Sequence, residues 1–397
     1  MKTPERLASV DLLRGVVMII MALDHTRDYV HVGAMHFQPE NLEKTTAAIF
    51  FTRWITHFCA PVFMFCAGLG AWFWLQRRAR SAALQGRPGA DKRALSRFLV
   101  TRGLWLLLLE FTVVRAGFYF HFTYDVVILL VFWALGMSMI ALAALIHLPW
   151  RALAVISVAM IALHNLADGV RVTSWIWNVL HQPGVIQTGG PIVFVAYPLV
   201  PWIGVMAAGF CLGPIYDVDA DRRSRLLIRL GIALTVAFVV IRVLNIYGDP
   251  RPWSGQPSAL FTVVSFLNTT KYPPSLLFLL MTLGPALALL GWIDRARPSE
   301  RNPLLVFGRV PLFYFALHIP LIHAIAIALT WFRYGAQPFL FLPPPTLGTP
   351  LKLFPADYGW SLGVTYVVWI AVVVILYPVC LWFSRVKSRG HWWASYL

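Results

Sequence analysis

Hydrophobic residues in this chain are gathered into long runs that short polar segments separate. Ten runs can be drawn, near residues 8–32, 47–75, 103–122, 126–147, 152–167, 191–213, 228–247, 275–292, 304–332 and 362–384. A helix needs about 20 apolar residues to cross a hydrocarbon core that is about 30 Å thick. The pattern therefore predicts an all-α polytopic membrane protein with about ten transmembrane helices, in which residues 1–397 form a single integral-membrane domain.

Composition and charge agree with this class and exclude another. The chain is 59% hydrophobic and 13% charged, with a net charge of +16. Its basic residues gather in short segments between the apolar runs, at 77–102, 222–229, 295–301 and 385–389, as the positive-inside rule requires. We therefore exclude nucleic-acid binding, and we expect a multi-pass protein of the cell inner membrane with both termini in the cytoplasm.

The first apolar run has charged residues at both ends. Its uninterrupted part, residues 15–23, covers only ~13 Å at 1.5 Å per residue, so some of the flanking charges must lie at membrane depth. Such groups are costly there and are functional candidates by default. At 100° per residue, one helix face carries Asp11, Arg14, Met18, Met21, His25 and Asp28. Arg14 and His25 lie about 16 Å apart along this face, which therefore has two polar stations.

The densest polar cluster ends this first run and consists of Asp24, His25, Arg27 and Asp28. His25 and Asp28 are three residues apart, which places their side chains one helical turn from each other. A carboxylate in that place can fix the tautomer of the imidazole and raise its basicity, as a general base requires. The alternative is a helix end at the outer interface, with paired and solvated charges.

The second run holds a further basic pair. Arg53 and His57 are four residues apart and share one helix face. Pro61 removes the N–H that would bond to the carbonyl of His57, so we expect the helix to kink or open there. A freed carbonyl beside a histidine suits a ligand site, whereas a kink satisfied by a neighbouring helix would make His57 a structural residue.

Later runs contain five more polar residues of interest. We expect Glu110 and Arg115 to form an internal charge pair, because burying either one alone is prohibitive. Arg242 and Lys271 near the outer side can bind an anionic group, although snorkelling to the interface is the commoner fate. His318 lies beside a proline, so it is an imidazole on a helix that should be kinked.

Two N-terminal segments carry a resemblance to a known family. Residues 9–28 (SVDLLRGVVMIIMALDHTRD) and 52–68 (TRWITHFCAPVFMFCAG) resemble the N-terminal signature of the transmembrane acyltransferase superfamily, specifically of bacterial relatives of heparan-alpha-glucosaminide N-acetyltransferase. Weaker likeness extends over residues 197–213, 245–250, 271–283 and 308–318. The likeness therefore spans most of the chain.

This resemblance implies an acyltransferase embedded in the membrane. Such an enzyme moves an acetyl-type group from cytoplasmic acyl-CoA, here acetyl-CoA, to an acceptor hydroxyl or amine at the outer side, in particular on a glycan. In the superfamily an Arg-Gly pair opens the first helix and a histidine ends it, which Arg14, Gly15 and His25 match. Animal members resemble this pattern with Asn in place of His25 and a catalytic histidine near His36. Both histidines are therefore candidates for the base.

Resemblance and residue chemistry together suggest a role for each candidate. His25 takes the proton of the acceptor, Asp28 orients His25, and Arg53 or His57 stabilises the developing oxyanion. The candidate catalytic residues are His25, Asp28, His57 and His36. The candidate substrate-binding residues are Asp11, Arg14, Asp24, Arg27, Arg53, Arg242, Lys271 and His318.

Two other classes of protein fit parts of the pattern. A proton-coupled transporter of a small molecule also places His, Asp, Glu and Arg along a pathway. A membrane haem protein would need facing pairs among His25, His57, His121, His318 and His323. The four cysteines lie inside apolar runs and form no zinc motif, so we expect no metal. The expected partners are the lipid bilayer, acyl-CoA and a glycan or small-molecule acceptor; a homodimer is an assembly left open.

Overall fold

The computed structural model describes residues 8–86, 89, 91–187, 189–391 and 394. Its longer helices are α1 (Ala8–Val30), α3 (Ala47–Thr56), α4 (Cys59–Leu84), α5 (Lys92–Leu109), α7 (Val131–Leu145), α8 (Trp150–Ala162), α10 (Leu199–Leu212), α11 (Ala220–Leu244), α13 (Leu276–Trp292), α15 (Pro311–Tyr334) and α16 (Leu362–Ser388). Its shorter helices are α2 (Val32–His36), α6 (Arg115–Tyr119), α9 (Trp175–Leu180), α12 (Ala259–Leu267) and α14 (Pro303–Arg309). Single π or 3₁₀ turns are η1 (Glu110–Val114), η2 (His164–Ala167), η3 (Gly213–Asp217), η4 (Pro338–Phe341), η5 (Pro345–Leu347) and η6 (Leu351–Leu353).

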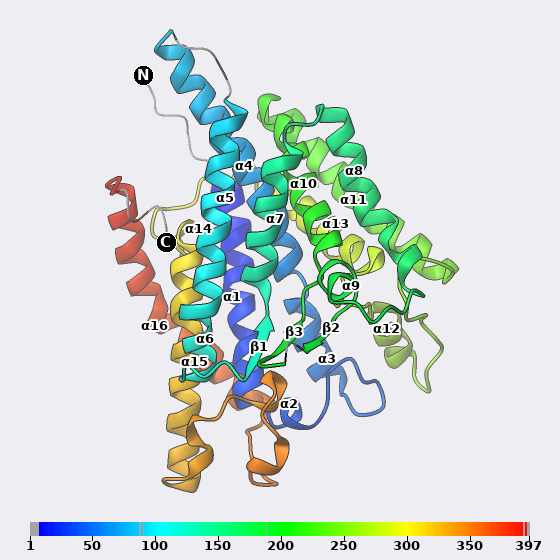
Figure 1. The fold of residues 1–397 in the computed structure, drawn as a ribbon, viewed down its shortest axis with the longest axis vertical. Helices are drawn as coiled ribbons and strands as arrows, with labels where there is room; N and C mark the ends of the chain where they lie inside the picture. Colours follow the sequence, from blue (N-terminus) through cyan, green and yellow to red (C-terminus); the bar gives the residue numbers. More distant parts are fainter. Residues whose placement is uncertain (1–7, 87–88, 90, 188, 392–393, 395–397) are drawn as a thin grey trace.

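These helices make the chain a multi-pass membrane protein. Five helices of the described ranges are long and apolar enough to cross a bilayer: Ala47–Leu84, Leu199–Asp217, Ala220–Leu244, Pro311–Tyr334 and Leu362–Ser388. Helices α7, α8 and α13 are apolar but shorter. The start of α1 and the end of α16 lie on the same side of the bundle as the α4–α5 connection (Figure 1). The total of about ten spans and the cytoplasmic location of the termini stay predictions.

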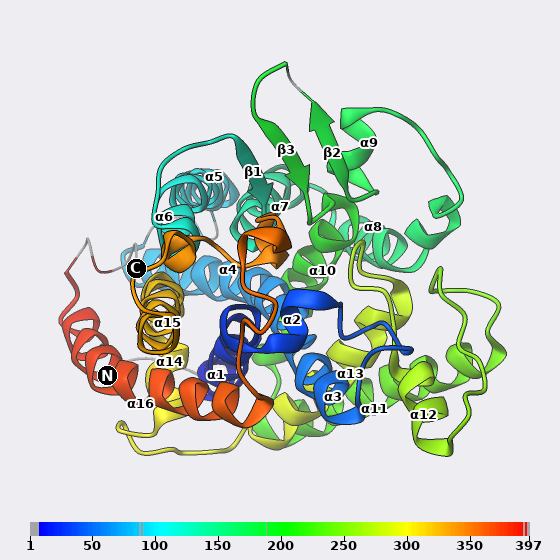
Figure 2. The same cartoon turned by 90° about the horizontal axis from the view of Figure 1, so that it is seen from below.

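Helix α1 lies inside the bundle. It packs against α3, α4, α13, α14, α15 and α16, and the view along the bundle shows these helices grouped around it (Figure 2). The burial of α1 explains how one helix can carry several charged residues, because they pair with each other and with groups of α3 and α4 and not with lipid.

Four helix pairs cross at glycines that leave room for the neighbouring backbone. In the α1–α14 pair, a Cβ on Gly15 would lie 1.8 Å from the carbonyl oxygen of Leu304, and one on Gly308 would lie 1.7 Å from that of Asp11. The pairs α4–α10, α5–α7 and α11–α13 meet in the same way, at Gly68 and Gly209, at Gly103 and Gly136, and at Gly231 and Gly284. Small residues at helix crossings let membrane helices approach closely and gain van der Waals contact.

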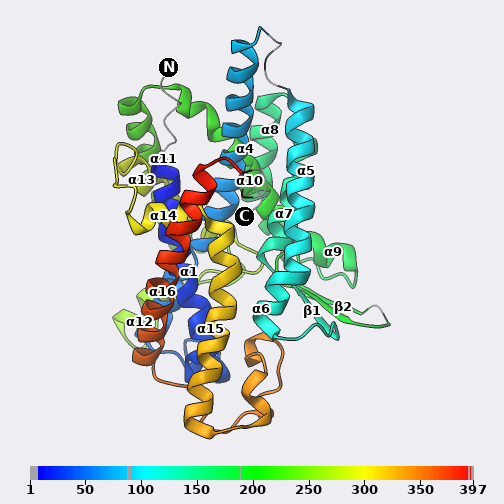
Figure 3. The same ribbon diagram turned by 90° about the vertical axis from the view of Figure 1, so that its left-hand side faces the viewer.

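A small sheet replaces helix at two places where the hydrophobic runs predicted it. Strands β1 (Val126–Leu129), β2 (Gly184–Gln187) and β3 (Ile192–Val195) form a sheet in the order β1-β3-β2. β1 pairs with β3 in parallel, and β2 pairs with β3 antiparallel. The sheet projects sideways from the bundle, near α6 and α9 (Figure 3). β1 and β3 are rich in the β-branched residues Val and Ile, which favour strands, so hydrophobicity alone did not distinguish them from the adjoining helices.

Two local expectations have opposite outcomes. The break predicted before Pro61 is confirmed, because α3 ends at Thr56 and α4 begins at Cys59. The expected pairing of Glu110 with Arg115 is wrong. Glu110 instead accepts hydrogen bonds from backbone N–H groups at the start of α7, and Arg115 donates to the carbonyls of Val126 and Thr123. Backbone groups therefore supply the hydrogen-bond partners of both side chains, which a sequence pattern does not display.

Candidate functional site

Two cavities open along α1. The first, which we call the His25 cavity, has a volume of about 450 Å³. Its polar lining includes Asp24, His25, Arg27, Asp28, Gln38, Glu40, Arg53, Arg251, Lys271 and Tyr272. The second, which we call the Arg14 cavity, has a volume of about 350 Å³. Its charged lining consists of Arg14, Arg77, Arg102, Arg309 and Lys387, with no acidic side chain among the described lining residues.

A thin apolar wall separates the two cavities. Phe63, Val131 and Phe315 line both of them. The two polar stations predicted on one face of α1 therefore open into different cavities, which meet back to back at these three side chains. The His25 ring lies 6.4 Å from the Phe315 ring, centroid to centroid, so the imidazole is about one side chain away from the Arg14 cavity.

Among the described residues, aromatic rings contact His25 and no side chain or backbone group forms a hydrogen bond with it. Its ring contacts Phe118 edge-on at a centroid distance of 5.4 Å and approaches the ring of His318 to 5.2 Å. The Nδ1 of His318 lies 2.8 Å from the carbonyl oxygen of Phe315. Because a carbonyl only accepts, this contact assigns the proton of His318 to Nδ1 and leaves its Nε2 as an acceptor. The structure thus brings together two candidate histidines that are far apart in the chain.

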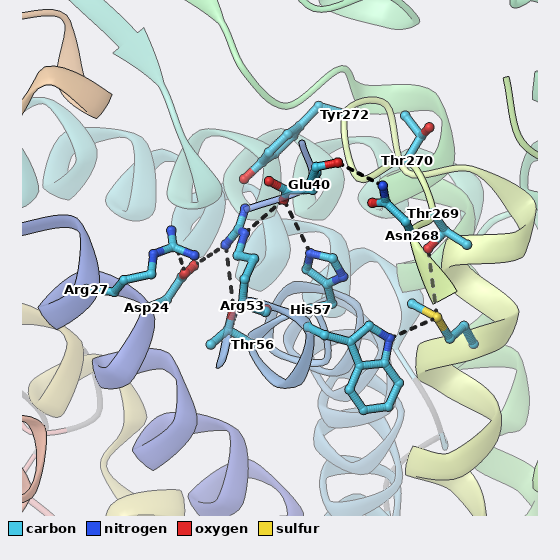
Figure 4. Close-up of polar contacts among 12 residues, drawn as sticks. Asp24, Arg27, Glu40, Arg53, Thr56, His57, Asn268, Thr269, Thr270 and Tyr272 are labelled. Carbon is cyan, nitrogen blue, oxygen red and sulfur yellow. Dashed lines mark hydrogen bonds and ion pairs between the residues drawn. The ribbon is translucent and has the colours of Figure 1, made fainter. Parts of the chain in front are cut away.

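A network of ion pairs forms the floor of the His25 cavity (Figure 4). Asp24 pairs with Arg27 at 3.2 Å and with Arg53 at 2.5 Å. Arg27 also pairs with Asp28 at 2.7 Å. The carboxylate of Asp28 is therefore directed to Arg27, and no hydrogen bond joins it to His25 among the contacts of the described chain. The network holds Arg53 against the cavity with its charge balanced by carboxylates on both sides.

Glu40 completes this network and was not singled out in the sequence. Its Oε1 accepts from the Nε of Arg53 at 3.1 Å and lies 3.7 Å from the Nε2 of His57. Burial alone would raise the pKa of Glu40, but the neighbouring Arg53 and His57 outweigh it and hold that pKa well below its ordinary value. His57 is fully buried behind Arg53 and does not line the cavity. It therefore supports Glu40 from behind the cavity lining.

The remaining candidates divide into those at a cavity and those away from both. Lys271 lines the His25 cavity from the loop before α13 and lies 5.2 Å from the ring centroid of Tyr272. Arg242 is 1% exposed, lines neither cavity, and donates to the backbone carbonyls of residues 251, 265, 266 and 268. His36 is exposed on α2 and also lines neither cavity.

Arg14 and Asp11 lie at the second cavity. The Nη2 of Arg14 donates to the carbonyl of Cys66 at 2.7 Å, and its Nη1 lies 3.7 Å from Asp11. Arg14 is thus anchored on α4 while its side chain still lines the cavity. Asp11 is 3% exposed and does not itself line the cavity, so it positions Arg14.

Comparison with known proteins assigns the chain to a family. Residues 6–248, more than half of the chain, match the family model for the catalytic region of heparan-alpha-glucosaminide N-acetyltransferase. No curated protein matches the chain. The matched region contains both N-terminal signature segments and the whole ion-pair network, whereas Lys271 and Tyr272 of the cavity lining lie outside it. The chain belongs to the heparan-alpha-glucosaminide N-acetyltransferase catalytic family.

Proposed function

We propose that this protein is a membrane acetyltransferase that uses acetyl-CoA bound in the Arg14 cavity to acetylate an acceptor held in the His25 cavity. One observation carries the proposal: the two cavities share the wall of Phe63, Val131 and Phe315. A donor in the Arg14 cavity and an acceptor in the His25 cavity can react at this wall, because the acyl group is the only part that has to move past it. Holding the two reactants in this way removes most of the entropic barrier to their encounter.

The charge of the Arg14 cavity supports the choice of donor. CoA carries phosphates at one end and a thioester at the other, so it suits a cavity with a basic rim and an apolar inner end. Arg77, Arg102 and Lys387 line the Arg14 cavity together with Arg309, whose guanidinium is paired with Glu300, and arginine binds phosphate through paired hydrogen bonds. The apolar wall at the inner end accommodates the acetyl group.

The reaction assigned to the His25 cavity is acyl transfer. The nitrogen or oxygen of the acceptor attacks the thioester carbonyl carbon, and His25 removes the proton of that nucleophile. The tetrahedral intermediate then expels CoA as its C–S bond breaks, and the histidinium returns the proton to the sulfur. Arg53 lines the same cavity and is the cation that faces the developing oxyanion.

The acidic groups of the His25 cavity support an amine or hydroxyl acceptor. Asp24, Asp28 and Glu40 all line it, and carboxylates accept hydrogen bonds from sugar hydroxyls and amines. The family to which the chain belongs is named for acetylation of a glucosaminide amine. We therefore propose an amino sugar at the end of a glycan as the acceptor, presented on the side of the membrane opposite to the basic loops.

Proteoliposomes test this proposal directly. Radiolabelled acetyl-CoA is added outside vesicles that enclose a glucosamine-terminated oligosaccharide, and the released CoA thiol and the acetylated sugar are both measured. Protein molecules whose Arg14 cavity faces outward should produce acetylated sugar inside the vesicles. Vesicles with His25→Ala protein should contain none. Movement of the sugar or of intact acetyl-CoA across the membrane without acetylated product would instead support the transporter.

A further inference from the structure

Three potential metal ligands meet away from both cavities. His164 lies on η2, Asp168 directly follows η2, and His181 directly follows α9. One ligand atom from each residue lies within 4.8 Å of the others. The Nε2 of His181 is 3.4 Å from the Oδ1 of Asp168, and the rings of His164 and His181 are 5.7 Å apart. The cluster joins two segments that the turn after η2 separates.

His164 is a buried imidazole whose ring nitrogens lack hydrogen-bond partners of normal geometry among the described residues. His164 is 7% exposed and His181 is 5% exposed. Neither ring nitrogen of His164 has a hydrogen-bond partner of normal geometry among the described residues. The backbone of Pro274 lies beside the same ring. An unpaired buried imidazole is costly, whereas a metal would take one nitrogen and leave the other to donate to a backbone carbonyl, the usual arrangement of a ligating histidine.

We propose that His164, Asp168 and His181 form a binding site for a divalent transition metal, with Zn²⁺ as the ion that fits best. Two imidazoles and one carboxylate are a common three-ligand set for zinc, with water in the fourth position. Tetrahedral ligands at about 2.0–2.1 Å from the ion stand ~3.4 Å apart. His181 and Asp168 already have this separation, and the ligand atom of His164 lies within 4.8 Å of both.

The metal site is connected to the His25 cavity, because residues next to its ligands contact or belong to segments that line this cavity. Asn165 donates to Asp168 at 2.8 Å and accepts from the backbone N–H of Leu276 at 2.8 Å, at the start of α13. The loop just before α13 supplies Lys271 to the cavity, and Pro183 lines the same cavity two residues after His181. A bound ion therefore fixes two lining segments of the His25 cavity relative to each other: the loop before α13 and the segment that contains Pro183.

Spacing explains why the sequence did not indicate this site. Three residues separate His164 from Asp168 and twelve separate Asp168 from His181, which matches no common zinc motif with paired cysteines or histidines. The fold closes the set by turning the segment between η2 and α9 back on itself.

Metal binding to the full chain tests the proposal. The protein is purified in detergent through a tag without histidine, stripped with chelator and titrated with Zn²⁺, and then with Co²⁺, whose visible absorption reports tetrahedral coordination. The variants are His164→Gln and Asp168→Asn. The matched control is His147→Gln, which removes a histidine whose Nε2 contacts Ser96 at 2.9 Å and which lies at the opposite end of α8 from the cluster.

We expect about one Zn²⁺ per chain, intense Co²⁺ bands between roughly 500 and 700 nm, and at least a hundredfold weaker binding in both cluster variants, because even outer partners of metal ligands change affinity by about 10–100-fold. His147→Gln should bind as the wild type does. Wild-type protein that binds no Zn²⁺, or that binds it equally well with and without His164 and Asp168, overturns the proposal. This readout needs no acetyl transfer, so it stands or falls separately from the proposed function.

Discussion

Replacement of His25 by alanine is the most informative single change. The imidazole lines the His25 cavity, and its contacts within the described chain are with the rings of Phe118, Phe315 and His318. Removing it therefore enlarges an existing cavity and breaks no hydrogen bond that holds the fold. We expect the chain to keep its fold and the reaction to slow strongly.

The size of each effect follows from this geometry. Loss of a positioned general base lowers the rate by about 10²–10⁴-fold, which corresponds to about 2.7–5.4 kcal/mol of barrier. Each of the three lost ring contacts is worth about 0.5–1.5 kcal/mol, so the melting temperature should fall while the chain still folds. The affinity for acetyl-CoA should stay unchanged, because Arg14 and its basic neighbours line the other cavity.

The assay measures CoA thiol release in the presence of a glucosamine-terminated oligosaccharide, together with acetyl-CoA binding and the melting temperature. The matched control is His36→Ala, since His36 is exposed and lines neither cavity. Free imidazole should restore part of the activity of His25→Ala, because a cavity of about 450 Å³ plus the space of the lost ring can admit it. Full activity in His25→Ala, or loss of activity in His36→Ala alone, would refute this assignment.

Three further changes test the surrounding structure. Gly15→Ala should lower the unfolding free energy by about 3 kcal/mol or more and abolish acetyl-CoA binding, because the new Cβ would lie 1.8 Å from a backbone oxygen of α14. The control is Gly255→Ala, whose Cβ would meet nothing within 4 Å, and melting curves in detergent compare the two variants. Glu40→Gln should cost about 1.5–3 kcal/mol at neutral pH. Folding lowers the pKa of Glu40, so the stability that its carboxylate contributes is complete above the ordinary pKa of 4.5 and is lost as the pH falls below it. The melting temperatures of wild type and Glu40→Gln should therefore converge in acid. A difference that stays constant with pH would contradict the pairing. Arg242→Met should destabilise the protein by at least about 3 kcal/mol, because its guanidinium donates to four carbonyls, without weakening acetyl-CoA binding; unchanged melting would rule out this bracing role.

The features that the sequence predicted well are those set by neighbours on one helix. The spacing of Arg14 and His25 on one face of α1 is a property of helical geometry, and their openings into two cavities agree with it. The break before Pro61 likewise depends only on a missing backbone donor, and α3 and α4 are separate helices. Both features follow from the geometry and hydrogen bonding of a single helix, so the sequence alone was enough to predict them.

The features that the sequence missed depend on contacts between distant segments. Arg53 lies between Asp24 of α1 and Glu40 of the loop after α2, and no periodicity links these positions. Arg242 looked like a candidate for an anion, yet backbone carbonyls of a later loop occupy its guanidinium. Carbonyl groups are present at every residue, so their arrangement around a cation becomes visible only in the folded chain.

The wall formed by Phe63, Val131 and Phe315 also bears on how the cell keeps its ion gradients. A carrier must expose its whole cargo first to one compartment and then to the other, which demands large movements of helices. Here the three shared side chains lie between the two cavities, and the proposed reaction requires only a two-carbon group to move past them. If transfer proceeds as proposed, no helix has to open a path for a whole cargo molecule, and the ion permeability of the membrane should not rise during turnover.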